Sequence, residues 1–143
     1  MKRVLVPVDP TQPARTRSAI EQVVRMARDE PLTACLLRVQ PKVSGHVSMF
    51  FDPRELRELQ QTAGAEELEP ARALLEAAGV PCTCTVLVGR SAPTIVAAAR
   101  DLGCDRIVFA KEEPSLAASL FGSLAHQVRQ TLGSAADLRV IGS

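Results

Sequence analysis

The residues of this chain that could bind a ligand gather where short apolar runs end. Asp9 directly follows the run from Val4 to Val8. Its carboxylate could accept hydrogen bonds from a ligand or help to hold a cation. It could equally cap its own turn, because aspartate before a proline is favoured in turns. The sequence leaves these two roles of Asp9 open.

Small residues at two further points are suited to binding an anion. Gly89 ends another apolar run, and Ser91 is predicted to cap the helix that follows. The pair Gly122 and Ser123 precedes a second helical pattern. Free N–H groups at a helix N-terminus, with a serine hydroxyl beside them, can hold a phosphate. Simple helix capping explains each pair as well, so neither alone identifies a phosphate site.

The sequence carries no recognisable catalytic motif. It lacks G-x-S-x-G, H-E-x-x-H, G-x-x-x-x-G-K and G-x-G-x-x-G. His126 follows Ser123 at a spacing that would allow a hydrolase dyad, but an ordinary helix histidine is the preferred interpretation. We therefore predict no catalytic residues and do not expect an enzyme.

Two cysteines share one face of a predicted strand. Cys82 and Cys84 are two residues apart, and side chains at this spacing point to the same side of a strand. A metal site would need further cysteines or histidines nearby, and neither His46 nor His126 is close in sequence. We therefore predict buried packing cysteines, no metal and no required cofactor.

Composition and charge restrict the partners of the chain. Its 143 residues fit one domain, 1–143, and 46% of them are hydrophobic. The formal net charge is +1, with no tyrosine or tryptophan, so we expect neither nucleic acid nor a membrane as a partner. Asp9 cuts the first apolar run short, which favours a strand over a signal peptide. A cytoplasmic protein is expected.

Strand and helix patterns alternate along the chain. Between the short apolar runs, apolar residues recur every three or four positions, as they do on one face of a helix. Such alternation predicts an α/β fold with an open, five-stranded parallel sheet covered by helices on both faces. Ligands bind such sheets beyond the carboxyl ends of the strands. The predicted strands are 4–8, 33–39, 82–88, 106–110 and 138–141.

Two stretches depart from a regular pattern. Gly64 and Pro70 interrupt the long helical stretch before Gly79, which predicts a kink or two helices there. Residues 41–52 show no clear period and are predicted to form a loop. The apolar run from Met49 to Phe51 inside this loop could form a lid or contact a partner, but an anchor that packs against the protein is the preferred interpretation.

The order of these pieces resembles the universal stress protein family over nearly the whole chain. Val6-Pro7-Val8-Asp9 is similar to the end of the family's first strand. The segments 36–39, 88–95 and 105–110 resemble its second strand, its third strand with the following helix, and its fourth strand. Gly122-Ser123 is similar to the pair that opens its last helix.

This resemblance implies the fold details and a nucleotide site. It implies a sheet of order 3-2-1-4-5, adenine nucleotide α-hydrolase-like, and a homodimer. Nucleotide-binding members carry Gly-x-x-Gly, nine residues, then Gly-Ser or Gly-Thr. Here Ala110 and Glu113 replace the two glycines, and only eight residues separate Glu113 from Gly122. The vestigial site implied by the resemblance, together with the glycines and serine above, comprises Pro7, Val8, Asp9, Val39, Gly89, Ala110, Gly122 and Ser123.

Two functions are compatible with these features. The first is a stress-response or signalling module that acts as a dimer through its C-terminal strand, binds an unknown protein partner and binds ATP weakly or not at all. The second is an ATP- or AMP-binding sensor, or a slow ATPase. A phospho-receiver is disfavoured because no aspartate ends the third strand, where the sequence reads Leu87-Val88-Gly89-Arg90.

Overall fold

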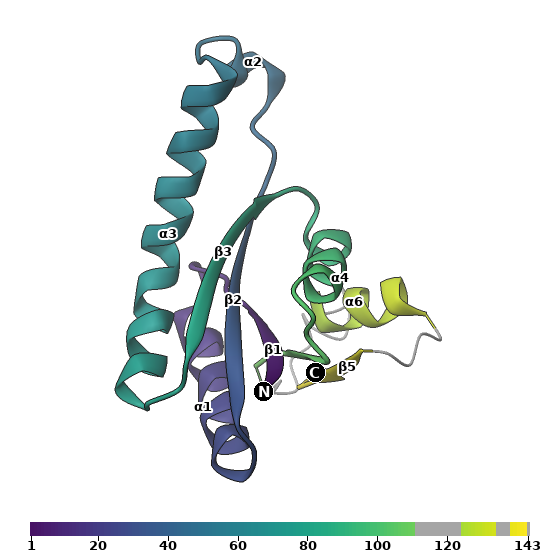
Figure 1. The fold of residues 1–143 in the computed structure, drawn as a ribbon. Helices are drawn as coiled ribbons and strands as arrows, with labels where there is room; N and C mark the ends of the chain where they lie inside the picture. Colours follow the sequence, from purple (N-terminus) through teal and green to yellow (C-terminus); the bar gives the residue numbers. More distant parts are fainter. Residues whose placement is uncertain (111–123, 134–137, 143) are drawn as a thin grey trace.

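The computed structural model of the chain describes residues 1–110, 124–133 and 138–142 (Figure 1). Strands and helices alternate in it, as predicted. The strands are β1 (Lys2–Pro7), β2 (Leu32–Gln40), β3 (Cys82–Val88), β4 (Arg106–Val108) and β5 (Arg139–Ile141). The helices are α1 (Pro13–Asp29), α2 (Gly45–Ser48), α3 (Pro53–Ala77), α4 (Ser91–Asp101) and α6 (Leu124–Leu132).

The five strands form one parallel sheet of order β3-β2-β1-β4-β5, which confirms the predicted order. The central strand β1 is apolar at each position that faces a helix layer, and Val4, Leu5 and Val6 are completely buried. This pattern is typical of a parallel strand covered on both faces. The prediction that β3 lies at an edge of the sheet is also confirmed.

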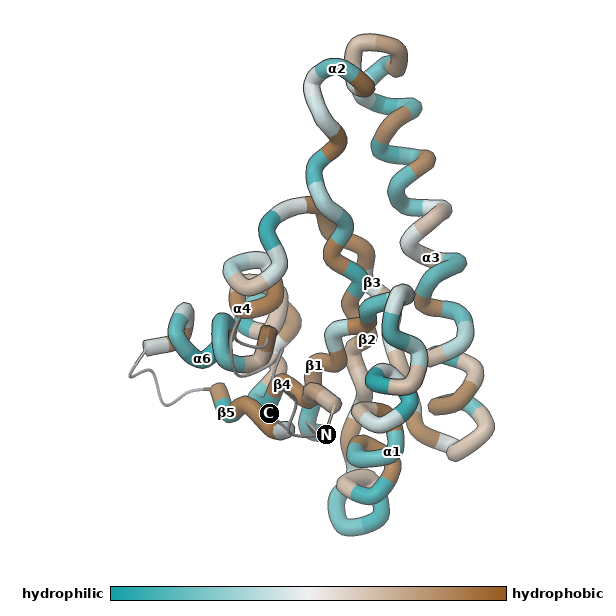
Figure 2. The backbone as a smooth tube through the Cα atoms, turned by 180° about the vertical axis from the view of Figure 1, so that it is seen from behind, coloured by the Kyte–Doolittle hydropathy of each residue, from teal (hydrophilic) through white to brown (hydrophobic). Residues whose placement is uncertain are grey.

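Two helix layers enclose the sheet and divide the core in two. Helices α1 and α3 cover one face, where Val23 and Leu75 pack against strand residues such as Val6. Helices α4 and α6 cover the other face, where Ile95 and Val128 belong to the same cluster as strand residues. Figure 2 shows apolar residues concentrated along the central strands between these layers. Successive side chains of each strand thus point to opposite faces of the sheet and pack into the two cores in turn.

The long helix α3 is continuous, so of the two alternatives predicted at Gly64 and Pro70, a kink or two helices, the division into two helices is wrong. Gly64 is buried against β3, and a Cβ added there would lie 2.4 Å from Val86 Cγ1. The glycine therefore allows helix and strand to approach closely, and it does not end the helix. Pro70 is exposed and is accommodated inside the helix. Tertiary packing outweighs the local preference of both residues.

The segment predicted as a loop contains the short helix α2, whose N-cap Ser44 accepts a hydrogen bond from the Val47 amide. The interpretation of the following apolar residues as an anchor is wrong. Met49 is 80% exposed and Phe50 75% exposed. Together with the first turns of α3, α2 projects beyond the end of the sheet (Figure 1), where no core is available to cover it.

A buried charge secures β4 near its start. Arg106 is 5% exposed, and its guanidinium contacts Glu30 at 2.5 Å and Asp105 at 3.2 Å. Burial by itself would lower the pKa of Arg106, but the hydrogen bonds to Glu30 and Asp105 raise it. The guanidinium therefore stays charged and links β4 to the end of α1.

Candidate functional site

The carboxyl ends of β1, β2 and β3 lie together at one end of the sheet, which is where ligands bind in open parallel α/β proteins. The Val8 amide donates to the Leu37 carbonyl at 2.8 Å, which extends the β1–β2 pairing past the last strand residue. The Gly89 amide donates to the Gln40 carbonyl at 3.0 Å and ties the end of β3 to the end of β2. The segments after β1, β2 and β3 are thus held side by side.

Asp9 is exposed and engaged in its own turn. Its Oδ1 accepts a hydrogen bond from the Thr11 amide at 2.9 Å and another from Thr11 Oγ1 at 2.6 Å. Asp9 therefore caps its own turn, which is one of the two roles that the sequence leaves open for it. A ligand that used the same oxygen would have to compete with both donors.

The end of β2 carries a polar network that the sequence analysis missed. Glu67 of α3 accepts from Arg38 Nε at 2.9 Å and from Gln40 Nε2 at 3.0 Å. Arg38 also donates from Nη1 to the Val39 carbonyl at 2.9 Å. An arginine within an otherwise apolar buried strand needs a partner, and this was the available signal. The network holds α3 against β2. It also means that the Val39 carbonyl already accepts one hydrogen bond from Arg38.

Gly89 packs closely against the helix that follows β3. A Cβ at Gly89 would lie 2.7 Å from Thr94 Oγ1, so a larger residue would push against the first turn of α4. The prediction that Ser91 caps this helix is wrong. Arg90 is the N-cap, it forms no side-chain cap bond, and Ser91 is the first helical residue. The amides of the first turn therefore receive no side-chain cap from Arg90.

The end of β4 is enclosed by two other parts of the chain. β4 stops at Val108, two residues earlier than predicted, but the Phe109 amide still donates to the Ile141 carbonyl at 2.8 Å. On the other side, Gln22 Nε2 of α1 donates to the Phe109 carbonyl at 2.6 Å. Ala110, which replaces the first loop glycine of the family pattern, is 7% exposed. The chain therefore leaves β4 in a closely packed environment.

The structure places six of the eight candidate site residues at the ends of four adjacent strands. Gly122 and Ser123 lie outside the described residues. The six that the structure locates are Pro7, Val8, Asp9, Val39, Gly89 and Ala110. Their placement at one edge agrees with the site geometry expected of an open α/β sheet, and their role in binding stays a prediction.

The cysteines, the possible metal ligands and the helices give three further observations. Cys84 is exposed and Cys82 only half-buried, so the prediction that both are buried packing residues is wrong. In the described parts of the chain, no three His, Cys, Asp or Glu side chains are grouped so that they could hold a metal ion. None of the helices described is long and apolar enough to cross a membrane.

The sheet order and the two helix layers define the chain as an open, parallel α/β protein. Within this class, the model of the universal stress protein family matches residues 1–132. The chain therefore belongs to the universal stress protein family. No curated protein matches its sequence.

Solved structures support the fold over the full chain. Hypothetical protein MJ0577 has a TM-score of 0.72 and 23% identity, covering 99% of this chain and 96% of that chain. A universal stress protein in complex with cAMP has a TM-score of 0.68 and 17% identity, with coverage of 98% and 96%. A family member from Arabidopsis thaliana with AMP bound has a TM-score of 0.61 and 16% identity, with coverage of 99% and 92%. At these identities the likeness concerns the fold.

Proposed function

We propose that the chain is a stress-response or signalling module without enzymatic activity, which acts as a dimer, binds a protein partner, and binds ATP weakly or not at all. The observation that carries the proposal is the residue at the end of β4. A phosphate loop needs glycine where the backbone must approach the phosphates, because a Cβ blocks that approach. Ala110 stands at this position and is buried, so its methyl group adds bulk where space is already limited.

The residues after Ala110 add an electrostatic argument from the sequence. Glu112 and Glu113 would bring two negative charges to the loop that holds phosphates in nucleotide-binding members. Two like charges about 7 Å apart, at an effective dielectric constant near 20, repel by about 2 kcal/mol. One such clash weakens binding about thirtyfold. Lys111 offsets part of this repulsion, whereas the loop shortened by one residue has no such compensation.

Isothermal titration calorimetry with ATP and magnesium tests this proposal. The natural chain is expected to bind with a dissociation constant far above the micromolar range. The double variant Ala110→Gly with Glu113→Gly restores both glycines and is expected to bind ATP more tightly, whereas Glu112→Gly alone restores neither. A dissociation constant in the low-micromolar range for the natural chain would overturn the proposal.

A second candidate, an adenine nucleotide sensor, is favoured by the ligands of two similar structures. One of these proteins was solved with AMP and another with cAMP. Each ligand has a single phosphate, so it depends less on a complete phosphate loop than ATP does. Val8, Asp9 and Val39 lie at the edge where the family pattern places the adenine side. Titrations with AMP and cAMP in the same calorimeter decide: micromolar binding of either would establish the sensor.

The dimer is proposed to form through residues 137–141 at the C-terminal strand. β5 pairs only with β4, so its other edge has no partner strand among the described residues. Val140 and Ile141 are half-buried, which leaves apolar surface beside that edge. Unpaired edges of this kind favour pairing with another chain. Two copies related by a twofold axis would cover both edges at once.

A further inference from the structure

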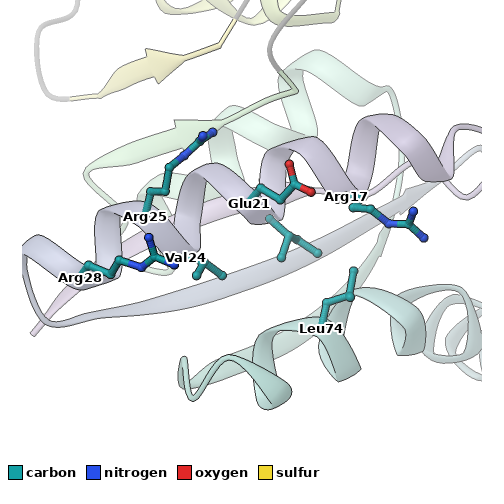
Figure 3. A pocket seen from close by; sticks show the side chains of 7 residues that line it. Arg17, Glu21, Val24, Arg25, Arg28 and Leu74 are labelled. Carbon is teal, nitrogen blue, oxygen red and sulfur yellow. The ribbon is translucent and has the colours of Figure 1, made fainter.

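A groove on the outer surface of α1, bordered by α3, combines an apolar floor with a basic rim (Figure 3). Its volume is about 380 Å³. Val24 of α1 and Leu74 of α3, which is 40% exposed, form the accessible part of the floor, and the buried Ile20 lies at its base. An apolar surface between two helices, open to solvent along its length, has the form of a site that accepts another helix.

Three arginines surround this floor. Arg17, Arg25 and Arg28 line the groove, and all three are exposed. None of them has a hydrogen bond or an ion pair to any residue that the structure describes. Elsewhere the chain does pair a partly exposed arginine: Arg72 of α3 contacts Glu69 at 2.6 Å and Glu76 at 2.5 Å. The groove arginines therefore have donors available for an incoming acceptor.

One acidic residue also lies in the groove. Glu21 is among its lining residues but makes no ion pair with Arg17 or Arg25 at a distance within 4.0 Å among the described contacts. Three positive charges against one negative charge leave the groove basic. The molecule as a whole has a net charge of only +1, so the positive charge is concentrated here locally. A complementary ligand is therefore anionic.

The spacing of the arginines indicates an elongated ligand. Arg17 and Arg28 are eleven residues apart on one helix, which corresponds to about 16 Å, or three turns. Residues 17, 21, 24 and 28 recur at helical spacing, so they form one stripe along α1. A small ligand with a single anionic group could engage one end of this stripe and not the other. A helix with several carboxylates could engage both ends while its apolar side chains fill the floor.

From this complementarity we infer that the α1–α3 groove binds an acidic amphipathic helix of a partner protein. The inference rests on the proposed protein-interaction role and specifies the partner for it. Leucine-type side chains of the partner pack on Val24 and Leu74. Its glutamates and aspartates pair with the arginines on either side. Bidentate pairing with a carboxylate suits arginine in particular.

The test uses a fluorescein-labelled helical peptide of about 18 residues, which is five turns. Leucines recur in it every three or four residues, and glutamates flank them. A second peptide has lysine in place of each glutamate. Fluorescence anisotropy is expected to show binding of the acidic peptide and at least about tenfold weaker binding of the lysine peptide. Equal binding of the two peptides, or no binding of the acidic one, would overturn the inference.

Matched protein variants locate the site. The double variant Arg17→Glu with Arg28→Glu is expected to weaken binding at least about tenfold, since two pairs are lost and replaced by repulsion. The control, Arg54→Glu with Arg57→Glu, makes the same change of net charge at exposed sites on the first turns of α3 and is expected to stay within about twofold. Similar losses in both variants would refute the groove as the binding site.

Two further measurements separate a docking groove from a merely basic patch and from a membrane-binding surface. Leu74→Ser keeps every charge and is expected to weaken binding of the acidic peptide, which a basic patch without an apolar floor would not show. Vesicles of equal parts phosphatidylcholine and phosphatidylserine are expected not to bind, and vesicle binding that depends on Arg17 and Arg28 would replace the helix with a membrane surface. ATP calorimetry on the same proteins tests the proposed function separately, because the groove residues lie outside the strand ends.

Discussion

Replacing Gly64 with alanine tests how closely α3 packs against the edge strand β3. A Cβ at this position would lie 2.4 Å from Val86 Cγ1 and 2.7 Å from Val86 Cγ2. Valine is branched at Cβ and rotates with difficulty, so the methyl groups cannot move aside freely. Overpacking of this kind costs about 3 kcal/mol at its upper end, and the helix preference of alanine over glycine returns about 1 kcal/mol. The free energy of unfolding is therefore expected to fall by about 2 kcal/mol.

Urea denaturation followed by circular dichroism measures this change and its cause. Val86→Ala removes the clashing methyl groups and by itself is expected to cost about 2 kcal/mol. In the double variant the new methyl group of residue 64 fills part of that space, so the total loss is expected near ~2 kcal/mol and not near ~4 kcal/mol. Gly45→Ala is the control, because nothing lies within 4 Å of its added Cβ. A neutral or stabilising Gly64→Ala, or additive losses, would refute the reasoning.

Three other predictions concern assembly, a buried ion pair and a thiol. Val140→Pro removes a ladder donor from β5 and is expected to give monomers in light scattering, whereas an unchanged dimer would place the interface elsewhere. Glu30→Gln leaves the charge of buried Arg106 with less compensation and is expected to cost about 1–2 kcal/mol in thermal unfolding; an unchanged melting temperature would contradict this. Partial desolvation of the exposed Cys84 thiol by its neighbours, and then the nearby Cys82, raise the pKa of Cys84 above its ordinary value of 9.0. Its alkylation by iodoacetamide, followed by peptide mass spectrometry with Cys84→Ser as control, should therefore accelerate about tenfold per pH unit up to at least about pH 9. A plateau below about pH 9 would show that the pKa is not raised.

The fold was predictable because the hydrophobic pattern identifies the strands and helices, and their order along the chain limits the possible topologies. Val4 to Val8 are apolar without interruption, and only a strand covered on both faces requires this. The alternating elements then leave few parallel arrangements. The resemblance selected the order β3-β2-β1-β4-β5, which the structure has.

The errors occur where distant contacts override local preferences. Gly64 was interpreted as a helix breaker because no local pattern reveals that Val86 lies against it. Pro70 costs the helix one hydrogen bond, yet packing on both sides of it keeps α3 continuous. Met49 and Phe50 were expected to be anchored because they are apolar, but the projecting end of α3 holds them away from the core.

The candidate site was predictable only as a location. Strand ends identify the edge of the sheet, so Asp9 and Gly89 could be assigned to it in advance. Side-chain engagement could not be predicted: Asp9 is held by Thr11, and Glu67 reaches the end of β2 from a helix position 29 residues away from Arg38. Such pairs depend on the relative placement of helix and strand, which the local pattern does not contain.

The two proposed binding surfaces use different residues, and this makes them separable. Binding at the strand ends depends on close backbone approach, which Ala110 opposes through bulk, and on the charges of the phosphate loop. Binding in the α1–α3 groove depends on exposed arginines and on the apolar floor between them. Salt screens the charges at both surfaces, so the separation comes from the variants. A ligand whose affinity falls in Arg17→Glu with Arg28→Glu and is unchanged in Ala110→Gly with Glu113→Gly belongs to the groove, and the opposite pattern assigns a ligand to the strand ends.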